Sequence, residues 1–316
     1  MGRIKIGSHN IGQDYPPFII AEMSGNHNTS LDRALSIVDS AADSGAHAIK
    51  LQTYTPETMT LDINHSEFVI NNADSIWNGR SLYSLYEEAH TPWEWHIKIM
   101  ERAKEKNILC FSTPFDESSV DFLESLEVPC YKISSFECTD LPLIKKVAST
   151  GKPMIISTGM ASISDIAETV KVASSGGCKD IILLKCTSTY PASPDSTNLR
   201  TISNMREVFN CEVGISDHTN GIGVSLGSIA FGSTVIEKHF TLARSDGGVD
   251  SLFSLEPNEL KDLSVESKSV WQALGGIHYG PTSSEKKSLI GRRSIYVSED
   301  IKKGEVLTIK NIRRIR

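Results

Sequence analysis

Eight short apolar runs, each followed by a longer amphipathic stretch, constrain the fold of this chain more than any other feature. The runs are FIIAEM (18–23), AHAIKLQ (46–52), ILCFS (108–112), CYKIS (130–134), PMIIST (153–158), DIILLKC (180–186), CEVGIS (211–216) and TVIEKHF (234–240). Short apolar runs that alternate with helical stretches are typical of βα units around a parallel sheet. An open doubly wound sheet usually has fewer strands and a glycine-rich first turn, which is absent here. We therefore predict an α/β protein with a (β/α)8 barrel.

The 316 residues fit one barrel of roughly 250 residues and a small appendage. We expect the catalytic barrel to span 1–275, a linker to follow over 276–290, and the start of a small β-rich module to occupy 291–316. Segment 53–91 is too long for a bare strand-to-helix connection and is predicted to form a flap, or else an excursion packed on the barrel rim. Four aromatic residues in it favour a lid: Tyr54, Trp77, Tyr83 and Tyr86.

Composition excludes several classes of function. The formal net charge is −7 and basic residues cluster only at the end of the chain, so a general nucleic-acid surface is not expected. The opening MGRIKIGSHN has no apolar signal core, and no stretch approaches the roughly 18 apolar residues of a membrane span. The six cysteines form no CxxC pair and are predicted to be reduced, buried structural thiols. We expect a cytoplasmic protein that binds neither membranes nor nucleic acids.

The chemistry of a barrel enzyme lies at the carboxyl ends of its strands. All eight runs turn polar there, which predicts an active site. In chain order the polar and adjoining residues are Glu22, Ser24, Asn26 and His27; Lys50 and Gln52; Ser112, Thr113 and Phe115; Lys132, Ser134, Ser135 and Glu137; Ser157 and Thr158; Thr187, Ser188 and Tyr190; Ser216, Asp217 and His218; and Glu237, Lys238 and His239.

Two of these residues are lysines inside apolar strands. Either Lys50 or Lys132 alone could be a solvated rim residue. Together, with hydroxyl residues around them, they suit a ligand that carries both phosphate and carboxylate. The hydroxyl residues are Thr113, Ser135, Ser157 and Ser216.

Two histidines follow neighbouring strands of the predicted barrel. A lone histidine is usually structural, but His218 and His239 should approach each other across one inter-strand gap. Strand eight also adjoins strand one in a closed barrel, which brings Glu22 to the same side. Two imidazoles and a carboxylate predict a divalent ion such as Mn, Fe, Co or Zn, with open positions for water and substrate.

Eight motifs resemble, in order and spacing, those of the sialic acid synthase family. They are IAEMSGNHN, AIKLQTY, STPFD, YKISSFE, ISTGM, KCTSTYP, GISDHT and EKHFTL. The flap sequences LQTYTPETMTLD and WNGRSLYSLYEEAHTPWEWH resemble the pseudaminic acid synthase branch more than the N-acetylneuraminate branch. The resemblance covers the whole predicted barrel.

The resemblance implies a (β/α)8 barrel followed by an antifreeze-like (SAF) domain that a domain-swapped homodimer exchanges between subunits. SIYVSEDIKKGEVLTIKNIRRIR resembles the first part of that domain. Arg316 corresponds to an arginine that family members contribute to the partner's sugar site. The expected site is therefore completed by a second copy of the chain.

The resemblance also implies roles for individual residues. Phosphoenolpyruvate contacts are expected from Lys50, Thr113, Lys132, Ser135, Ser157, Ser188, Tyr190 and Ser216, although the family more often carries Asn at the position of Ser188. Sugar contacts are expected from Gln52, Asn78, Phe115, Glu137, Asp250 and Arg316. The metal ligands are expected to be His218 and His239, holding Mn in preference to Mg or Co, and the catalytic residues Glu22, Lys50 and Lys132.

The expected reaction is a metal-dependent condensation of phosphoenolpyruvate with 2,4-diacetamido-2,4,6-trideoxy-L-altrose and water, which releases phosphate and a nonulosonic acid. An N-acetylneuraminate or legionaminic acid synthase, using another N-acyl hexosamine, is the nearest alternative. A Schiff-base aldolase with Lys132 as the amine is more distant. A phosphoenolpyruvate-dependent ketose-phosphate acid synthase lacks a second phosphate site, and a carbohydrate-binding module would not need the histidines and Glu22.

Overall fold

Eight parallel strands form a closed barrel in the computed structural model, which describes residues 4–73 and 75–316. The strands are β3 (Phe18–Glu22), β4 (Ala48–Thr53), β5 (Leu109–Pro114), β6 (Tyr131–Ile133), β7 (Met154–Ser157), β8 (Ile181–Cys186), β9 (Glu212–Asp217) and β10 (Val235–His239). Every predicted run forms a strand, and each strand ends within two residues of the predicted boundary. The prediction of a (β/α)8 barrel is confirmed.

Strand β10 closes the barrel by pairing with both β9 and β3. In this register His239 lies opposite Glu22, which in turn lies opposite Lys50 on β4. The carboxyl ends of all eight strands therefore meet at one end of the barrel. The polar residues that the sequence places at the strand ends are brought together there.

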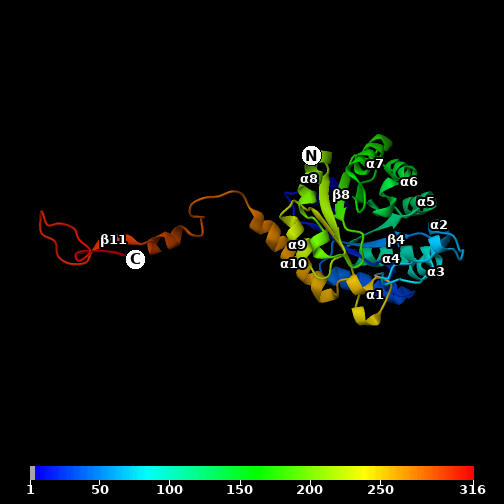
Figure 1. Cartoon of the computed structure of the whole chain (residues 1–316), viewed down its shortest axis with the longest axis horizontal. Helices are drawn as coiled ribbons and strands as arrows, with labels where there is room; N and C mark the ends of the chain where they lie inside the picture. The colour runs from blue at the N-terminus through cyan, green and yellow to red at the C-terminus, as the bar shows by residue number, and fades with distance from the viewer. Residues whose placement is uncertain (1–3, 74) are drawn as a thin grey trace. The chain divides into compact units, whose positions relative to one another are not determined.

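Helices surround the strands (Figure 1). They are α1 (Leu31–Asp43), α4 (Trp93–Glu105), α5 (Glu117–Ser125), α6 (Leu141–Ala148), α7 (Ile163–Gly176), α8 (Arg200–Phe209), α9 (Gly223–Ile229) and α10 (Pro257–Leu274). Short 3-10 turns are η1 (Ser24–His27), η3 (Phe136–Thr139), η4 (Pro194–Ser196), η5 (Arg244–Asp246) and η6 (Ser251–Phe253). Side-chain caps start four of these helices, α1, α5, α6 and α7. At α1 the hydroxyl of Ser30 accepts from Arg33 N, and at α7 that of Ser162 accepts from Asp165 N. Within the described part of the chain, no helix has the length and apolar character needed to cross a bilayer.

The strands are buried on both faces, which explains why they are continuous apolar runs rather than alternating ones. All five residues of β3 are buried, as are all six of β9. Close packing explains why β9 contains a glycine: a Cβ at Gly214 would lie 2.3 Å from the carbonyl oxygen of Val235. Burial on both faces leaves the strand ends as the places where polar groups can gather.

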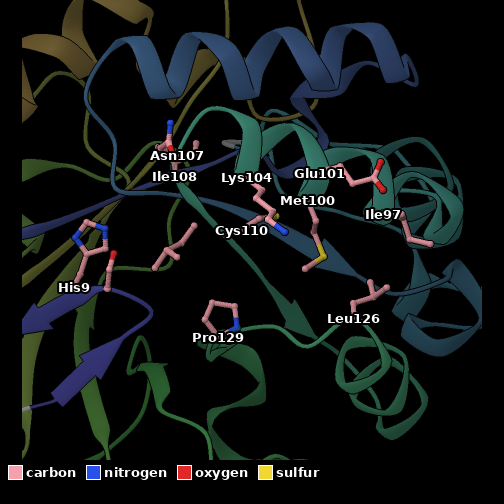
Figure 2. A pocket seen from close by; sticks show the side chains of 12 residues that line it. His9, Ile97, Met100, Glu101, Lys104, Asn107, Ile108, Cys110, Leu126 and Pro129 are labelled. Atoms are coloured by element: carbon pink, nitrogen blue, oxygen red, sulfur yellow. The ribbon is translucent and has the colours of Figure 1, made fainter.

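A hairpin that sequence reasoning missed precedes the barrel. It consists of β1 (Ile4–Ile6) and β2 (His9–Ile11), which pair antiparallel across Gly7 at φ +55°. The hairpin, α4 and the start of β5 line an open pocket of about 610 Å³ at the amino end of the strands. In Figure 2, His9 and Ile97 lie at opposite ends of this pocket.

The segment predicted to be a flap, 53–91, follows β4. It contains α2 (Pro56–Met59), η2 (Ser66–Phe68) and α3 (Leu82–Ala89). Val69 and Ser81 form an isolated antiparallel bridge that folds its middle part back on itself. Backbone hydrogen bonds within the segment therefore hold its middle part in place.

The chain divides into two units, Met1–Leu274 and Gly275–Arg316. The second unit holds η7 (Lys286–Gly291) and two antiparallel strands, β11 (Ser294–Val297) and β12 (Ile312–Ile315). The short turn η7 falls largely within the predicted linker. Gly304, in the segment between these two strands, has φ +87°. The relation to an antifreeze-like domain stays a prediction.

Candidate active site

A cavity of about 620 Å³ lies at the carboxyl ends of the barrel strands. Charged and imidazole side chains from several strands reach it, together with side chains from the flap. The barrel residues that line it include Glu22, Ser24, Lys50, Gln52, Phe115, Lys132, Ser134, Ser135, Glu137, Ser157, Cys186, Tyr190, Ser216, His218, Glu237, His239 and Asp250. Most of the residues predicted for the active site therefore gather around one cavity.

Two buried ammonium groups form the floor of this cavity. Lys50 is 4% exposed and donates to Thr113 Oγ1 at 3.2 Å, while Lys132 is 2% exposed and donates to Ser157 Oγ at 2.7 Å. The carboxylate of Glu237 lies between them, 3.5 Å from the Lys50 nitrogen and 3.6 Å from that of Lys132. Neither lysine is a solvated rim residue.

Glu237 is the counterion of both lysines. Burial disfavours its charged form, but the ammonium groups of Lys132 and Lys50 outweigh burial and lower the pKa of Glu237 to about 2. Ser216 Oγ also donates to Glu237 at 2.8 Å. Glu237 therefore stays ionised and keeps a positive charge available on the lysines.

Glu22 has the opposite electrostatic character. Burial raises its pKa to about 7, although the ammonium of Lys50 at 3.0 Å pulls the value down. Gln52 Nε2 donates to Glu22 at 2.9 Å and orients the carboxyl group. A carboxyl with a pKa near neutrality can accept a proton and give it back, which is what a general acid–base group requires.

Hydroxyl groups gather beside the lysines at the ends of β6, β7 and β8. Gly159 N donates to Ser135 Oγ at 3.1 Å. A Cβ at Gly159 would lie 2.2 Å from Ser188 Oγ and 2.7 Å from Ser135 Oγ. Only glycine leaves room for both hydroxyls, so Ser135 and Ser188 lie close together; Ser135 lines the cavity, Ser188 is not among the lining residues, and their contact with an anion stays a prediction.

The two histidines lie side by side on β10 and directly after β9, with ring centroids 5.2 Å apart. Burial and the nearby His218 lower the pKa of His239 well below its usual value, so its ring is neutral, the form that binds metals. His239 Nδ1 is buried, without a hydrogen-bond partner among the described residues, and lies 3.7 Å from Asp250 Oδ2.

This arrangement fits a divalent ion held by two imidazoles, with the other positions taken by water or substrate. Across residues 4–73 and 75–316, no group of three or more His, Cys, Asp or Glu side chains is arranged to hold a metal ion. The set of two imidazoles and the Glu22 carboxylate that strand order suggested is thus not found as a metal-binding group among these residues, and ligation by His218 and His239 stays a prediction.

Four of the predicted sugar contacts line the cavity: Gln52, Phe115, Glu137 and Asp250. Two do not. Asn78 is exposed on the flap, where its Oδ1 accepts from Asn72 N at 3.0 Å, and it is not among the lining residues. Arg316 ends the second unit and is exposed within it.

The flap covers the cavity with part of the predicted aromatic set. Tyr54, Trp77 and Tyr86 line the cavity. Trp77 Nε1 donates to the carbonyl of Val249 at 3.0 Å, which ties the flap to the loop after β10. Tyr83 is not among the lining residues; its hydroxyl donates to Glu57 at 2.6 Å, and its part in a lid stays a prediction.

The comparisons with known proteins agree with this geometry. The model of the NeuB family matches residues 37–279, which is most of the chain. This chain belongs to the NeuB family. The pseudaminic acid synthase of Campylobacter jejuni is 41% identical over 307 residues, 97% of this chain and 89% of the relative. That of Helicobacter pylori is 40% identical over 303 residues, 95% of this chain and 88% of the relative.

A solved structure supports the same assignment. The N-acetylneuraminic acid synthetase of Leptospira borgpetersenii superposes with a TM-score of 0.81 at 33% identity, covering 92% of this chain and 95% of that chain. The barrel of this NeuB family chain is therefore shown by its own strand pairing and by its likeness to a solved relative.

Two barrel residues of this NeuB family chain contribute to the cavity in ways that the sequence did not predict. Glu237 was recognised only as a polar strand end, although its spacing of two from His239 already indicates the same inward face. Cys186, expected to be structural, is buried but lines the cavity, with Sγ 3.8 Å from His218 Nδ1. The other five cysteines are buried away from the lining, and all six thiols are free.

Successive side chains of a strand point to opposite faces, which explains why two polar residues at strand ends do not reach the cavity. Asp217 and Lys238 lie one position away from Ser216 and Glu237 on neighbouring strands, so their side chains leave the opposite face. They form a fully buried ion pair at 3.4 Å. A polar residue at a strand end is thus a site residue only when it falls on the inward half of the pleat.

Proposed function

We propose that this NeuB family chain is a pseudaminic acid synthase. It condenses phosphoenolpyruvate with 2,4-diacetamido-2,4,6-trideoxy-L-altrose and water, and releases phosphate and a nonulosonic acid. The observation that carries the proposal is the pair of buried ammonium groups on the floor of a cavity that also holds Glu22 and two imidazoles. The similarity to pseudaminic acid synthases supports the choice of sugar.

Phosphoenolpyruvate carries a phosphate and a carboxylate on adjacent parts of a small molecule. Lys50 and Lys132 offer two separate cations, each with a hydroxyl partner, which suits one anionic group apiece. The hydroxyls of Ser135, Ser157 and Ser188 add donors on the Lys132 side. We assign the phosphate to that side because more donors converge there.

In the reaction, C3 of phosphoenolpyruvate forms a bond to the aldehyde carbon of the open-chain sugar, and the aldehyde oxygen gains a proton. Positive charge develops at C2, where water adds, and the tetrahedral intermediate then loses phosphate to leave a ketone. Glu22 accepts the proton of the attacking water, a role that its raised pKa suits. Lys50 and Lys132 offset the charge of the departing phosphate.

His218 and His239 are the residues that would hold a divalent ion, for which manganese is our first choice, and such an ion would supply Lewis acidity at the aldehyde oxygen. The requirement is tested by phosphate release after exhaustive chelation and again after Mn²⁺ is added back. Loss and recovery of activity are expected. Full activity in verified metal-free enzyme would remove the ion from the reaction.

The substrate is tested by phosphate release from phosphoenolpyruvate with three sugars: 2,4-diacetamido-2,4,6-trideoxy-L-altrose, an isomeric diacetamido-trideoxyhexose and N-acetylmannosamine. The first sugar is expected to give the highest kcat/KM. A preference for N-acetylmannosamine would contradict the proposal. Borohydride trapping with pyruvate tests the aldolase alternative, and no covalent adduct on Lys132 is expected.

We also propose that the active species is a homodimer in which the second unit of one subunit completes the site of the other through Arg316. Mixing a Glu22→Gln variant with an Arg316→Ala variant tests this. A mixed dimer contains one site with both native residues, so activity should rise above that of either variant alone. No gain after subunit exchange would argue against the shared site.

A further inference from the structure

The walls of the active-site cavity differ in chemistry according to the segment that supplies them. Among the described lining residues, every acidic, basic or imidazole side chain comes from the barrel strands and their adjoining loops outside 53–91. The flap contributes mainly apolar and aromatic groups. We call six of them the flap wall: Met59, Ile70, Trp77, Leu82, Leu85 and Tyr86.

The position of the flap wall is set at one end by Trp77. Its indole N–H donates to Val249 O at 3.0 Å, and its ring lies 5.7 Å from that of Tyr190. Tyr190 in turn lies 4.6 Å from the ring of His218. The wall therefore has a defined place relative to the imidazole pair.

Backbone hydrogen bonds hold the middle of the wall. Ile70 N donates to Arg80 O at 2.9 Å, and Gly79 N donates to Ile70 O at 2.7 Å. Both main-chain groups of Ile70 are thus engaged, which leaves its side chain as the part that faces the cavity. A substitution of that side chain does not remove these bonds.

Helix α3 supplies the other part of the wall. The hydroxyl of Ser81 caps its start by accepting from Ser84 N, which fixes the turn that carries Leu82 and Leu85. The end of α3 packs on η1, where a Cβ at Gly25 would lie 3.2 Å from the Cα of Ala89. The apolar surface is therefore built into the fold before any substrate is present.

An open-chain sugar that presents its aldehyde to the imidazoles must direct its other carbons and substituents toward the remaining walls. Hydroxyl groups placed against apolar side chains lose their hydrogen bonds to water without gaining others. Methyl groups gain from the same contact. We propose that the flap wall determines sugar specificity by binding a methyl group of the substrate, and so disfavours sugars that carry a hydroxyl there.

This inference rests on the proposed function and refines its substrate class. A 6-deoxy sugar with two acetamido groups has methyl groups at two kinds of position, C6 and the acyl ends. Sugars such as N-acetylmannosamine carry a hydroxymethyl group in place of the first. Apolar sites discriminate against an added hydroxyl by up to about 100-fold, so a preference of roughly 10- to 100-fold is expected.

The test compares kcat/KM for three sugars: the 2,4-diacetamido-trideoxyhexose, its 6-hydroxy analogue and its N-formyl analogue. The variant is Ile70→Thr, and the matched control is Ile63→Thr, at a flap residue that is 47% exposed and outside the cavity lining. The ratio of two kcat/KM values is independent of the fraction of enzyme that is folded. A destabilised variant therefore still gives an answer.

Ile70→Thr is expected to lower the preference for the methyl-bearing sugar by about five-fold or more, whereas Ile63→Thr leaves it within about two-fold. A fall in the 6-deoxy preference assigns the C6 methyl, and a fall in the acetyl preference assigns an acyl methyl. Unchanged ratios in Ile70→Thr and in Leu82→Thr would overturn the inference while the enzyme remains a synthase. No phosphate release by the wild type with any of these sugars would overturn the proposed function and the inference together.

Discussion

Two cavities of nearly equal volume, about 620 Å³ and 610 Å³, lie at the carboxyl and amino ends of the barrel strands. Both contain glutamate, lysine and histidine. In the carboxyl-end cavity the lysines are almost completely buried, and Glu237 is held between them. In the amino-end pocket Glu101 and Lys104 are exposed residues on α4. Equal volume and similar composition thus give different chemistry.

The difference comes from the way in which each wall is built. The strand ends direct side chains from several sides into one cavity where the charged groups are buried, so these charges lose water and act on one another at low effective dielectric. A helix presents its charged residues on the face that solvent reaches, where water and salt screen them. Each residue type of the amino-end pocket therefore provides a matched control for the active site.

Glu22→Gln is expected to have the largest effect. The amide keeps the size of the side chain but cannot accept a proton, so kcat should fall by about 10²- to 10⁴-fold. In the wild type, kcat should rise with pH through about 7, where Glu22 ionises. Glu101→Gln should change kcat less than about two-fold, because its exposed carboxylate is solvated. Wild-type turnover in Glu22→Gln would exclude the proton role.

His218→Ala should abolish tight binding of a divalent ion, measured by titration with Co²⁺ and its absorption spectrum. Loss of one of two protein ligands should weaken binding by at least about 100-fold. His9→Ala removes an imidazole from the amino-end pocket and should leave the Co²⁺ titration unchanged. Equal Co²⁺ affinity in both variants would place the ion elsewhere.

Lys132→Met should raise KM for phosphoenolpyruvate by about 10- to 100-fold, because it removes a charged donor from the anion pocket and leaves Glu237 with one cation. Lys104→Met removes an exposed ammonium and should leave KM unchanged. The measurement is KM at saturating sugar, with circular dichroism to verify folding. An unchanged KM in Lys132→Met would argue against the anion pocket.

The smallest effect concerns stability. Burial raises the pKa of Glu137 from 4.5 to about 7. The folded chain therefore binds this proton more tightly than the unfolded chain, and stability falls as the pH rises from about 4.5 to 7. At pH 8 the free energy of unfolding of Glu137→Gln, measured by urea denaturation, should exceed that of the wild type by about 1–2 kcal/mol. The difference is smaller than the full pKa shift would give because the side chain is partly exposed. The two proteins should be alike at pH 4, and a wild type favoured at pH 8 would contradict the burial argument.

Much of the carboxyl-end cavity was predictable because strand periodicity is simple. Side chains alternate between faces, and parallel strands end together, so Lys50, Lys132 and the two histidines could be assigned to one space from local runs alone. The partners of these residues could not. Glu237 lies between two lysines because of register and barrel closure, which no local pattern encodes.

The flap was harder to predict from the sequence than the strand ends. Its length indicates a functional segment, but a long irregular connection has no period from which the direction of a side chain follows. Trp77 lines the cavity, whereas Tyr83 does not and instead donates to Glu57, although both are aromatic residues of one segment. Asn78 lies on the exposed side, one residue after Trp77.

The sequence by itself determined the barrel, the end at which polar groups gather and the residue types that gather there, because hydrophobic periodicity and strand direction are local properties. The tertiary structure decided which of those groups touch. In the folded chain Glu237 pairs with two lysines, Glu22 has a pKa near neutrality, and apolar residues of the flap line the same cavity as the buried lysines. Such contacts depend on register, burial and long-range closure, which arise only when distant segments of the chain are packed together.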